Sequence, residues 1–186
     1  EIDPLSAGSI ELIKGASTLR YGGDAMGGVI LVLPALFNDS SYTKISLLAK
    51  GETNPNGGQI GLKVENHSKK LGLGHRLVVN TKRNRDAAAS NYVLSNTGFA
   101  QLSGSYYTQY IKGESQLSLT ASAFIQEIGI LAASHIGNVT DLNRALTSDT
   151  PLISRPFTYT ISPPSQRIQH YASKLKWKHK SSKYGD

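Results

Sequence analysis

Apolar and polar residues alternate with a period of two along most of this chain of 186 residues, and this alternation constrains the fold more than any other feature. Successive side chains of a β-strand point to opposite faces, so each alternating segment is expected to form a strand with one apolar and one polar face. Six segments alternate in this way: 44–51, 59–66, 71–82, 98–111, 116–127 and 171–180. The fold is therefore expected to be mostly β.

The connections between these segments are short and long in turn. Two are tight turns, at 66–70 and 112–114, and three are longer and rich in Asn, Ser, Gly, Pro or Asp, at 52–58, 83–97 and 129–165. If the strands run up and down in chain order, the tight turns share one end and the long loops the other. Outer-membrane β-barrels have this asymmetry. Strand length agrees, because about ten tilted residues cover roughly 23 Å, close to the apolar band of about 25 Å in such barrels.

Composition excludes several classes of protein. The chain has no Cys, which rules out disulfide frameworks, thiolate zinc sites and cysteine nucleophiles. Its longest apolar run, 29–33, is far shorter than the roughly 20 residues of a membrane-spanning helix. The net charge of +7 suits an anionic partner such as nucleic acid or lipopolysaccharide. The charges are scattered, however, so a solvated basic surface is the favoured interpretation.

Catalysis finds no support in the residue pattern. The five histidines are dispersed without a metal-ligand spacing, and no nucleophile motif lies near them. We therefore expect no catalytic residue, no metal site and no cofactor, and we do not expect an enzyme.

The most specific segment is 9–34, which reads as a strand, a helical turn, a glycine-rich bend and a second strand. Its glycines are expected to supply positive φ angles or close backbone approach. They lack the Lys-Ser/Thr sequence of a phosphate loop and the spacing of a dinucleotide fingerprint, so a structural bend is favoured. An ion pair between Arg20 and Asp24 is expected to lock this bend.

This segment closely resembles the end of the plug domain in TonB-dependent outer-membrane receptors. The family's "strand, Lys/Arg-Gly, Tyr-Gly, Gly-Gly-Val-Ile" pattern is carried here by Glu11, Lys14, Gly15, Arg20, Tyr21, Gly22, Asp24, Gly27 and Gly28, followed by Val29 and Ile30. Ala16 stands where the family often has Pro, and 31–34 replaces a common Asn-containing ending. Later stretches, at 91–99, 127–130 and 134–138, are similar to one branch of the family.

The resemblance implies a division of the chain. Residues 1–35 would be the C-terminal part of a small α/β plug domain. Residues 36–186 would form the first six or so strands of a large up-and-down antiparallel transmembrane β-barrel, with long extracellular loops at 83–97 and 129–165. Such barrels have about 22 strands around a plugged lumen, so six strands cannot close one. The chain is therefore expected to be an internal piece of a longer protein, with any secretion signal upstream.

The resemblance also implies a function, the energised uptake of a scarce ligand such as a siderophore, cobalamin, haem or a glycan. The expected location is the outer membrane of a Gram-negative bacterium. The expected partners are outer-membrane lipid, an unidentified small ligand and the TonB energy-transducing system, whose contact segment in the family lies upstream of the residues present here. No nucleic-acid partner is expected.

Four lysines alternate near the end of the chain: Lys174, Lys176, Lys178 and Lys180. They are expected to face the lumen or the plug, where solvent, acidic plug residues or an anionic ligand would surround them, with solvation favoured. On the opposite face, Trp177 would join an interfacial aromatic girdle with Tyr184. In a soluble sandwich the same Trp177 would lie in the core.

Two other classes of protein remain as alternatives. A surface β-sandwich binding module or adhesin would bury the apolar strand faces between two sheets and use its long loops for recognition. A basic nucleic-acid-binding protein would need aromatic and basic residues interleaved on one sheet, whereas the tyrosines here fall on both strand faces.

Overall fold

The computed structural model of the chain describes residues 6–134 and 136–180. Within these residues the fold is mostly β with antiparallel sheets, as predicted. The strands of the main sheet are β3 (Tyr42–Thr53), β4 (Asn56–Ser68), β5 (Leu73–Asn84), β8 (Phe99–Lys112), β9 (Ser115–Gly129) and β10 (Ser165–His179). Each of the six alternating segments lies in one of these strands, apart from a few end residues.

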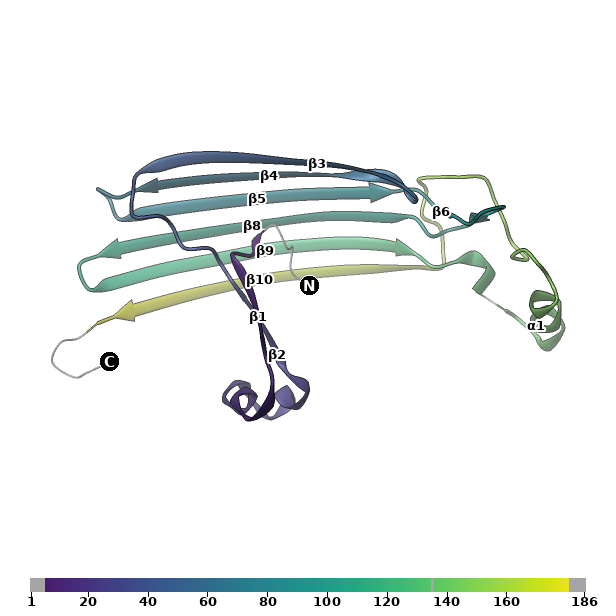
Figure 1. The fold of residues 1–186 in the computed structure, drawn as a ribbon, viewed down its shortest axis with the longest axis horizontal. Coiled ribbons are helices and arrows are strands. Elements are labelled where there is room, and N and C mark those ends of the chain that lie inside the picture. Colours follow the sequence, from purple (N-terminus) through teal and green to yellow (C-terminus); the bar gives the residue numbers. More distant parts are fainter. Residues whose placement is uncertain (1–5, 135, 181–186) are drawn as a thin grey trace.

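The main sheet is an open, up-and-down meander. Its strand order is β10-β9-β8-β5-β4-β3, and every neighbouring pair is antiparallel. Consecutive long strands are therefore neighbours in space, and β3 and β10 form the two edges (Figure 1). The sheet does not close on itself within the described residues.

The long loop predicted at 52–58 is wrong. β3 and β4 continue through this segment and are joined by a tight connection at Asn54 and Pro55. The glycines at 57 and 58 are strand residues at sites of close approach, since a Cβ on Gly58 would lie 2.8 Å from the carbonyl oxygen of Lys50. A glycine in the sequence can therefore indicate close approach of neighbouring strands as well as a loop. Two long connections, 85–98 and 130–164, remain at this end of the sheet.

The N-terminal segment forms a separate hairpin. Strands β1 (Ser9–Ile13) and β2 (Val29–Leu33) pair antiparallel, and the 3-10 helices η2 (Gly15–Tyr21) and η3 (Gly23–Gly27) lie between them. This is the predicted order of strand, helical turn, bend and strand. Positive φ angles occur at Gly15, Gly22 and Gly28, and Gly27 has none.

The expected ion pair between Arg20 and Asp24 is wrong for the described residues. Arg20 Nη2 instead donates to the hydroxyl of Tyr21 at 2.6 Å, and its guanidinium carbon lies 4.9 Å from the centre of that ring. Tyr21 thus provides both a hydrogen-bond acceptor and a cation–π contact, and together they hold the Arg20 guanidinium beside Tyr21 and not beside Asp24.

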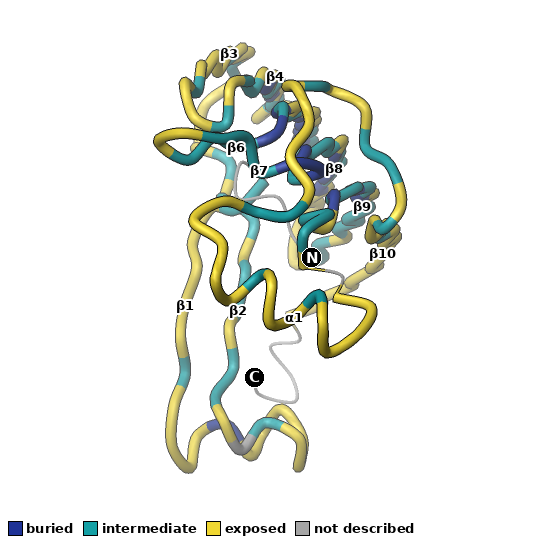
Figure 2. Tube along the Cα trace, turned by 90° about the vertical axis from the view of Figure 1, so that its right-hand side faces the viewer, coloured by how far each residue is buried: buried dark blue, intermediate teal, exposed yellow. Residues whose placement is uncertain are grey.

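The sheet is curved, and the hairpin lies on its concave side. Figure 2 looks along the strands from the end with the two long connections and has β1, β2 and helix α1 (Val139–Leu146) on the same side of the sheet. We call this side the concave face and the opposite side the outer face. The hairpin tip points away from the sheet (Figure 1).

The two long connections are held together by one asparagine. Asn96 is buried with a positive φ of 64°, and its side-chain nitrogen lies 2.8–2.9 Å from the carbonyl oxygens of Ile130, Ser162 and Pro164. Its side-chain oxygen accepts from the backbone of Ser162 at 2.9 Å. Asparagine tolerates the left-handed region better than most residues. It can therefore adopt this backbone conformation and also make the side-chain hydrogen bonds.

Replacing Asn96 by Ala is expected to loosen the connection at 130–164 by about 2–4 kcal/mol, because it removes these hydrogen bonds and strains the backbone. Amide hydrogen exchange of residues 130–164 measures the change. Asn96→Gly is the matched control, since it removes the same hydrogen bonds without the strain, and it should loosen the segment less. Unchanged exchange in both variants would refute the role of Asn96.

Candidate functional site

The outer face of the main sheet carries a continuous apolar band. Across the sheet, Leu47, Leu62 and Val79 stand in one register row, and Ile45, Val64 and Leu77 in the next. Their side chains are open to the surroundings, with Leu47 73% and Ile45 68% exposed. On β8 and β9 the band continues through the small residues Gly104, Ala121 and Ala123. Patches of this extent are rare on soluble monomers and mark an interaction surface.

Polar rows limit this band at both ends. Toward the long connections, the apolar pair Leu102 and Ile125 gives way in the next outward-facing row to Arg83, Glu127 and Arg167. Toward the tight turns, the band ends on β8 and β10 with the aromatic residues Tyr110 and Trp177, followed by the row Lys112, Ser115 and His179. On β4 and β5 it ends one row earlier, at Asn66 and His75. From Leu117 to Ile125 the band runs about 26 Å along β9 at roughly 3.3 Å per residue.

Trp177 lies on the outer face and is 70% exposed, so within the described residues it does not occupy a core position. Its ring stacks on His179, with ring centres 6.1 Å apart. Tyr184, its expected companion, lies outside the described residues.

The concave face has the opposite character, because most of its buried side chains are polar. Asn80 is 2% exposed, as is Ser103, and Gln126 is 6% exposed. Val78, Tyr107 and Phe124 are the buried hydrophobic residues of the described chain. A soluble globule buries apolar side chains and exposes polar ones, so this sheet has the reverse distribution.

A buried ion pair stands at the centre of the concave face. Glu65 on β4 and Arg76 on β5 are direct cross-strand partners, and both are buried. Glu65 Oε1 accepts a hydrogen bond from Arg76 Nε at 2.7 Å and lies 2.6 Å from Nη2 in an ion pair, and Lys63 Nζ lies 3.5 Å from the other carboxylate oxygen. Both charges are buried, so removing either one would leave the other as an unpaired charge in the protein interior, which is strongly destabilising.

Arg76 also binds the segment that joins the hairpin to β3. Its Nη1 donates to the carbonyl oxygen of Ala35 at 2.8 Å, and its guanidinium lies 4.9 Å from the ring centre of Phe37. The Phe37 ring stacks between His67 and Tyr107, with ring centres 5.5 and 5.7 Å away. One arginine therefore pairs with the sheet carboxylate and holds the linker across the concave face.

A second ion pair holds the linker near the tight turns. Lys69 Nζ donates to Asp39 Oδ2 at 2.8 Å. The hydrogen bond and the positive charge of Lys69 together lower the pKa of the Asp39 carboxyl, so this contact is kept at neutral pH. The pair is exposed, and its contribution to stability is correspondingly small.

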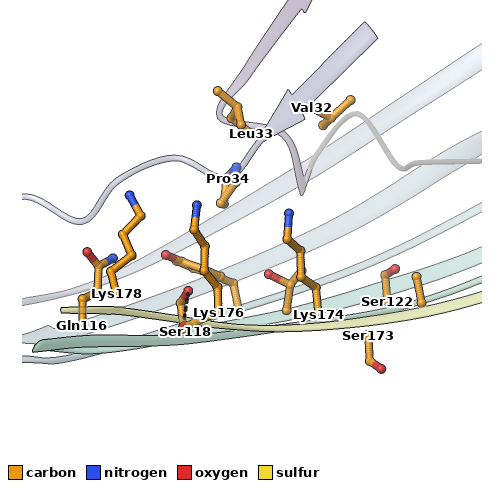
Figure 3. A pocket seen from close by; sticks show the side chains of 13 residues that line it. Val32, Leu33, Pro34, Gln116, Ser118, Ser122, Ser173, Lys174, Lys176 and Lys178 are labelled. Atoms are coloured by element: carbon orange, nitrogen blue, oxygen red, sulfur yellow. Dashed lines mark hydrogen bonds between the residues drawn. The ribbon is translucent and has the colours of Figure 1, made fainter. Parts of the chain in front are cut away.

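The concave face is hollowed beside β10. A cavity of about 290 Å³ lies between the tail of the hairpin, at Val32, Leu33 and Pro34, and the polar side of β9 and β10. Figure 3 has the side chains of Lys174, Lys176 and Lys178 standing in a row toward Pro34. Lys180 is not part of this row, since it follows the end of β10 and its backbone N–H donates to Glu114.

The nine residues of the sequence motif all lie in the hairpin. Glu11 is on β1, and the others surround η2 and η3 at the tip, far from the main sheet (Figure 1). None of them lines the cavity beside β10, and none lines a second cavity that lies between the hairpin tail and strands β5, β8, β9 and β10. Their assignment as a structural motif of a plug stays a prediction.

Sequence reasoning missed Glu65, Arg76 and Phe37 as the residues that join the linker to the sheet. Glu65 and Arg76 were recognisable only as members of the polar face of two alternating segments. Opposite charges on neighbouring strands are a signal for such a pair once the strand register is known. Phe37 lies outside every alternating segment, and no sequence signal singles it out.

Replacing Arg76 by Met is expected to lower the free energy of unfolding by about 3 kcal/mol, because Glu65 is left buried with Lys63 as its nearest charge. Denaturant titration measures this change. The double variant Glu65→Leu/Arg76→Met is the control and should recover most of the loss. Equal stability of wild type and Arg76→Met would show that the pair is not a structural constraint.

Within the described residues, no group of three or more His, Asp or Glu side chains is placed to hold a metal ion. No described helix is long and apolar enough to cross a membrane. No family model, curated protein or solved structure matches the chain.

Proposed function

We propose that this chain is part of a TonB-dependent outer-membrane receptor, which imports a scarce ligand across the outer membrane of a Gram-negative bacterium. The observation that carries the proposal is the reversed polarity of the six-stranded sheet, which has an exposed apolar band on its outer face and buried polar residues on its concave face. This is the distribution that a barrel wall needs between lipid and a wet lumen.

The dimensions of the apolar band support a lipid contact. Strands tilted by roughly 40° would turn its length of about 26 Å along β9 into about 20 Å across a bilayer, similar to the apolar belt of roughly 25 Å in outer-membrane barrels. The row containing Arg83 and Arg167 then lies at one head-group region, and Tyr110 and Trp177 lie at the other. Aromatic residues favour that interface because their rings have an apolar body and a polar edge.

The orientation follows from the connections. The tight turns at 69–72 and 113–114 would face the periplasm, and the connections at 85–98 and 130–164 would face the outside. The free edges of β3 and β10 would pair with further strands, because unpaired backbone groups in lipid cost several kcal/mol each.

The hairpin has the features of a plug segment in this arrangement. It lies on the concave side of the sheet, which would be the lumen, and Arg76 ties its linker to the wall. Ile10, Leu12 and Ile30 of its strands are more than half exposed, so the hairpin needs neighbouring chain to cover them. The rest of a plug domain would supply that cover, and the TonB system would act on the plug from the periplasm.

The alternative of a surface β-sandwich or adhesin requires a second sheet against the apolar band. Among the described residues, the two smaller sheets are the hairpin on the concave side and the short pair β6 (Ala87–Ala88) and β7 (Val93–Leu94) in a long connection. Neither covers the outer face. A sandwich would also place Asn80 and Gln126 on its solvent side, whereas both are buried.

Spin labels on adjacent residues of β4 test the membrane placement. The complete protein would carry a nitroxide at Leu62→Cys, on the outer face, or at Lys63→Cys, on the concave face, and this chain contributes no other Cys. In reconstituted bilayers, the label at 62 is expected to be several-fold more accessible to oxygen than to a polar nickel complex, because oxygen concentrates in lipid. The label at 63 is expected to show the reverse.

The two labels serve as controls for each other, since they differ by one residue on one strand. A label at 62 that is shielded from both reagents would indicate a second sheet and favour the sandwich. A label at 62 that prefers the nickel complex would place the outer face in water and refute the lipid contact.

Removal of the plug tests the transport role. A variant of the complete protein that keeps its secretion signal but lacks the following residues through 35 is expected to leave an open lumen. Cells that produce it should become several-fold more sensitive to large antibiotics that the intact outer membrane excludes. The intact protein, produced at the same level in the outer membrane, is the reference, and equal sensitivity of the two strains would argue against a plugged pore.

A further inference from the structure

The cavity beneath the tail of the hairpin carries positive charge that the described chain leaves unpaired. Lys174, Lys176 and Lys178 line it from one strand. Across residues 6–134 and 136–180, no carboxylate lies within ion-pair distance of these three ammonium groups. Lys50, Lys63, Lys69 and Lys82 each pair with an Asp or Glu. Other exposed lysines, such as Lys44 and Lys70, also have no ion pair among the described residues, but these three differ from them in lining one cavity together.

The spacing of the three charges favours an extended anion. Alternate residues of a strand lie about 6.6 Å apart, so the row spans roughly 13 Å. Like charges at this separation repel, and an anion bound between two of them relieves the repulsion of both. A single small anion would meet one ammonium group, whereas two linked anionic groups would meet two or three.

Neutral hydrogen-bond donors accompany the lysines. Thr120, the cross-strand partner of Lys174, lines the same cavity with Ser122. Ser118, the partner of Lys176, also lines it, and its hydroxyl donates to the backbone oxygen of Lys176 at 3.5 Å, a long contact that an anion could replace. A hydroxyl beside an ammonium group provides a second donor to an anionic oxygen. On the other side, Val32, Leu33 and Pro34 form an apolar wall, while the three lysines themselves are exposed.

We propose that this cavity binds an oxyanion that carries at least two phosphate or carboxylate groups. The lysines supply the charge, the hydroxyls of β9 supply neutral donors, and the hairpin tail closes one side (Figure 3). The site rests on these contacts and not on the membrane placement of the sheet. A failure of one proposal is therefore distinguishable from a failure of the other.

Calorimetric titration of the complete protein in mild detergent tests the site, with inorganic pyrophosphate and citrate as probes. Saturable binding of one anion per chain is expected, and it should weaken as the salt concentration rises. The triple variant Lys174→Gln/Lys176→Gln/Lys178→Gln is expected to bind about tenfold more weakly, which corresponds to the loss of three partly exposed charge contacts. The triple Lys→Arg variant at the same positions should retain binding.

The matched control removes the same amount of charge elsewhere. Lys44, Lys70 and Lys112 are exposed and do not line the cavity, and their triple Gln variant should bind within about twofold of wild type. An equal loss of affinity in both triple variants would show that binding depends only on net charge and would refute the site. Titration of wild type without saturation would also overturn it. If the first triple fails to fold, Lys176→Gln alone should bind about threefold more weakly, and unchanged binding would refute the site.

Discussion

An apolar band without a protein cover is the constraint on which the rest of this structure depends. The side chains of Ile45, Leu47, Ile60 and Leu62 lie on one face of a single curved sheet, and the described chain packs nothing against them. Leaving each such side chain in water costs roughly 1.5–3 kcal/mol of free energy relative to burying it. A neighbour that is itself apolar removes that cost, and under the proposed function this neighbour is the hydrocarbon of a lipid bilayer.

The same constraint accounts for the polar concave face. A strand has two faces. When the apolar face is turned outward, the polar side chains of the other face need hydrogen-bond or ion-pair partners on the concave side. Glu65 and Arg76 pair with each other, Arg76 also binds the linker, and Asn80 Oδ1 accepts from Gln59 Nε2 at 3.0 Å. Arg76 is the central residue because it pairs with the sheet carboxylate and with the linker carbonyl of Ala35. The hairpin is thereby positioned by polar contacts and ring stacking rather than by a hydrophobic core.

Order at the two ends of the sheet has different origins. At one end, two tight turns join long strands, and turns this short need no further contacts to be ordered. At the other, two long connections would be free to separate, and Asn96 holds them with four side-chain contacts. Ser95 adds a contact from its hydroxyl to the backbone of Arg155 at 2.6 Å. These contacts therefore hold the two long connections together at this end of the sheet.

The sequence by itself determined the strands, their faces and the hairpin, because period-two alternation and glycine placement are local properties of the chain. It predicted that Lys174 and Trp177 lie on opposite faces, and the fold agrees. The loop expected at 52–58 failed because glycine marks both loops and close strand packing, and only neighbouring strands distinguish the two. The Glu65–Arg76–Ala35 contact, the shared anchoring by Asn96 and the cavity under Pro34 were decided by the tertiary structure alone. Each joins residues far apart in the chain, and strand register and sheet curvature, not local pattern, bring them together.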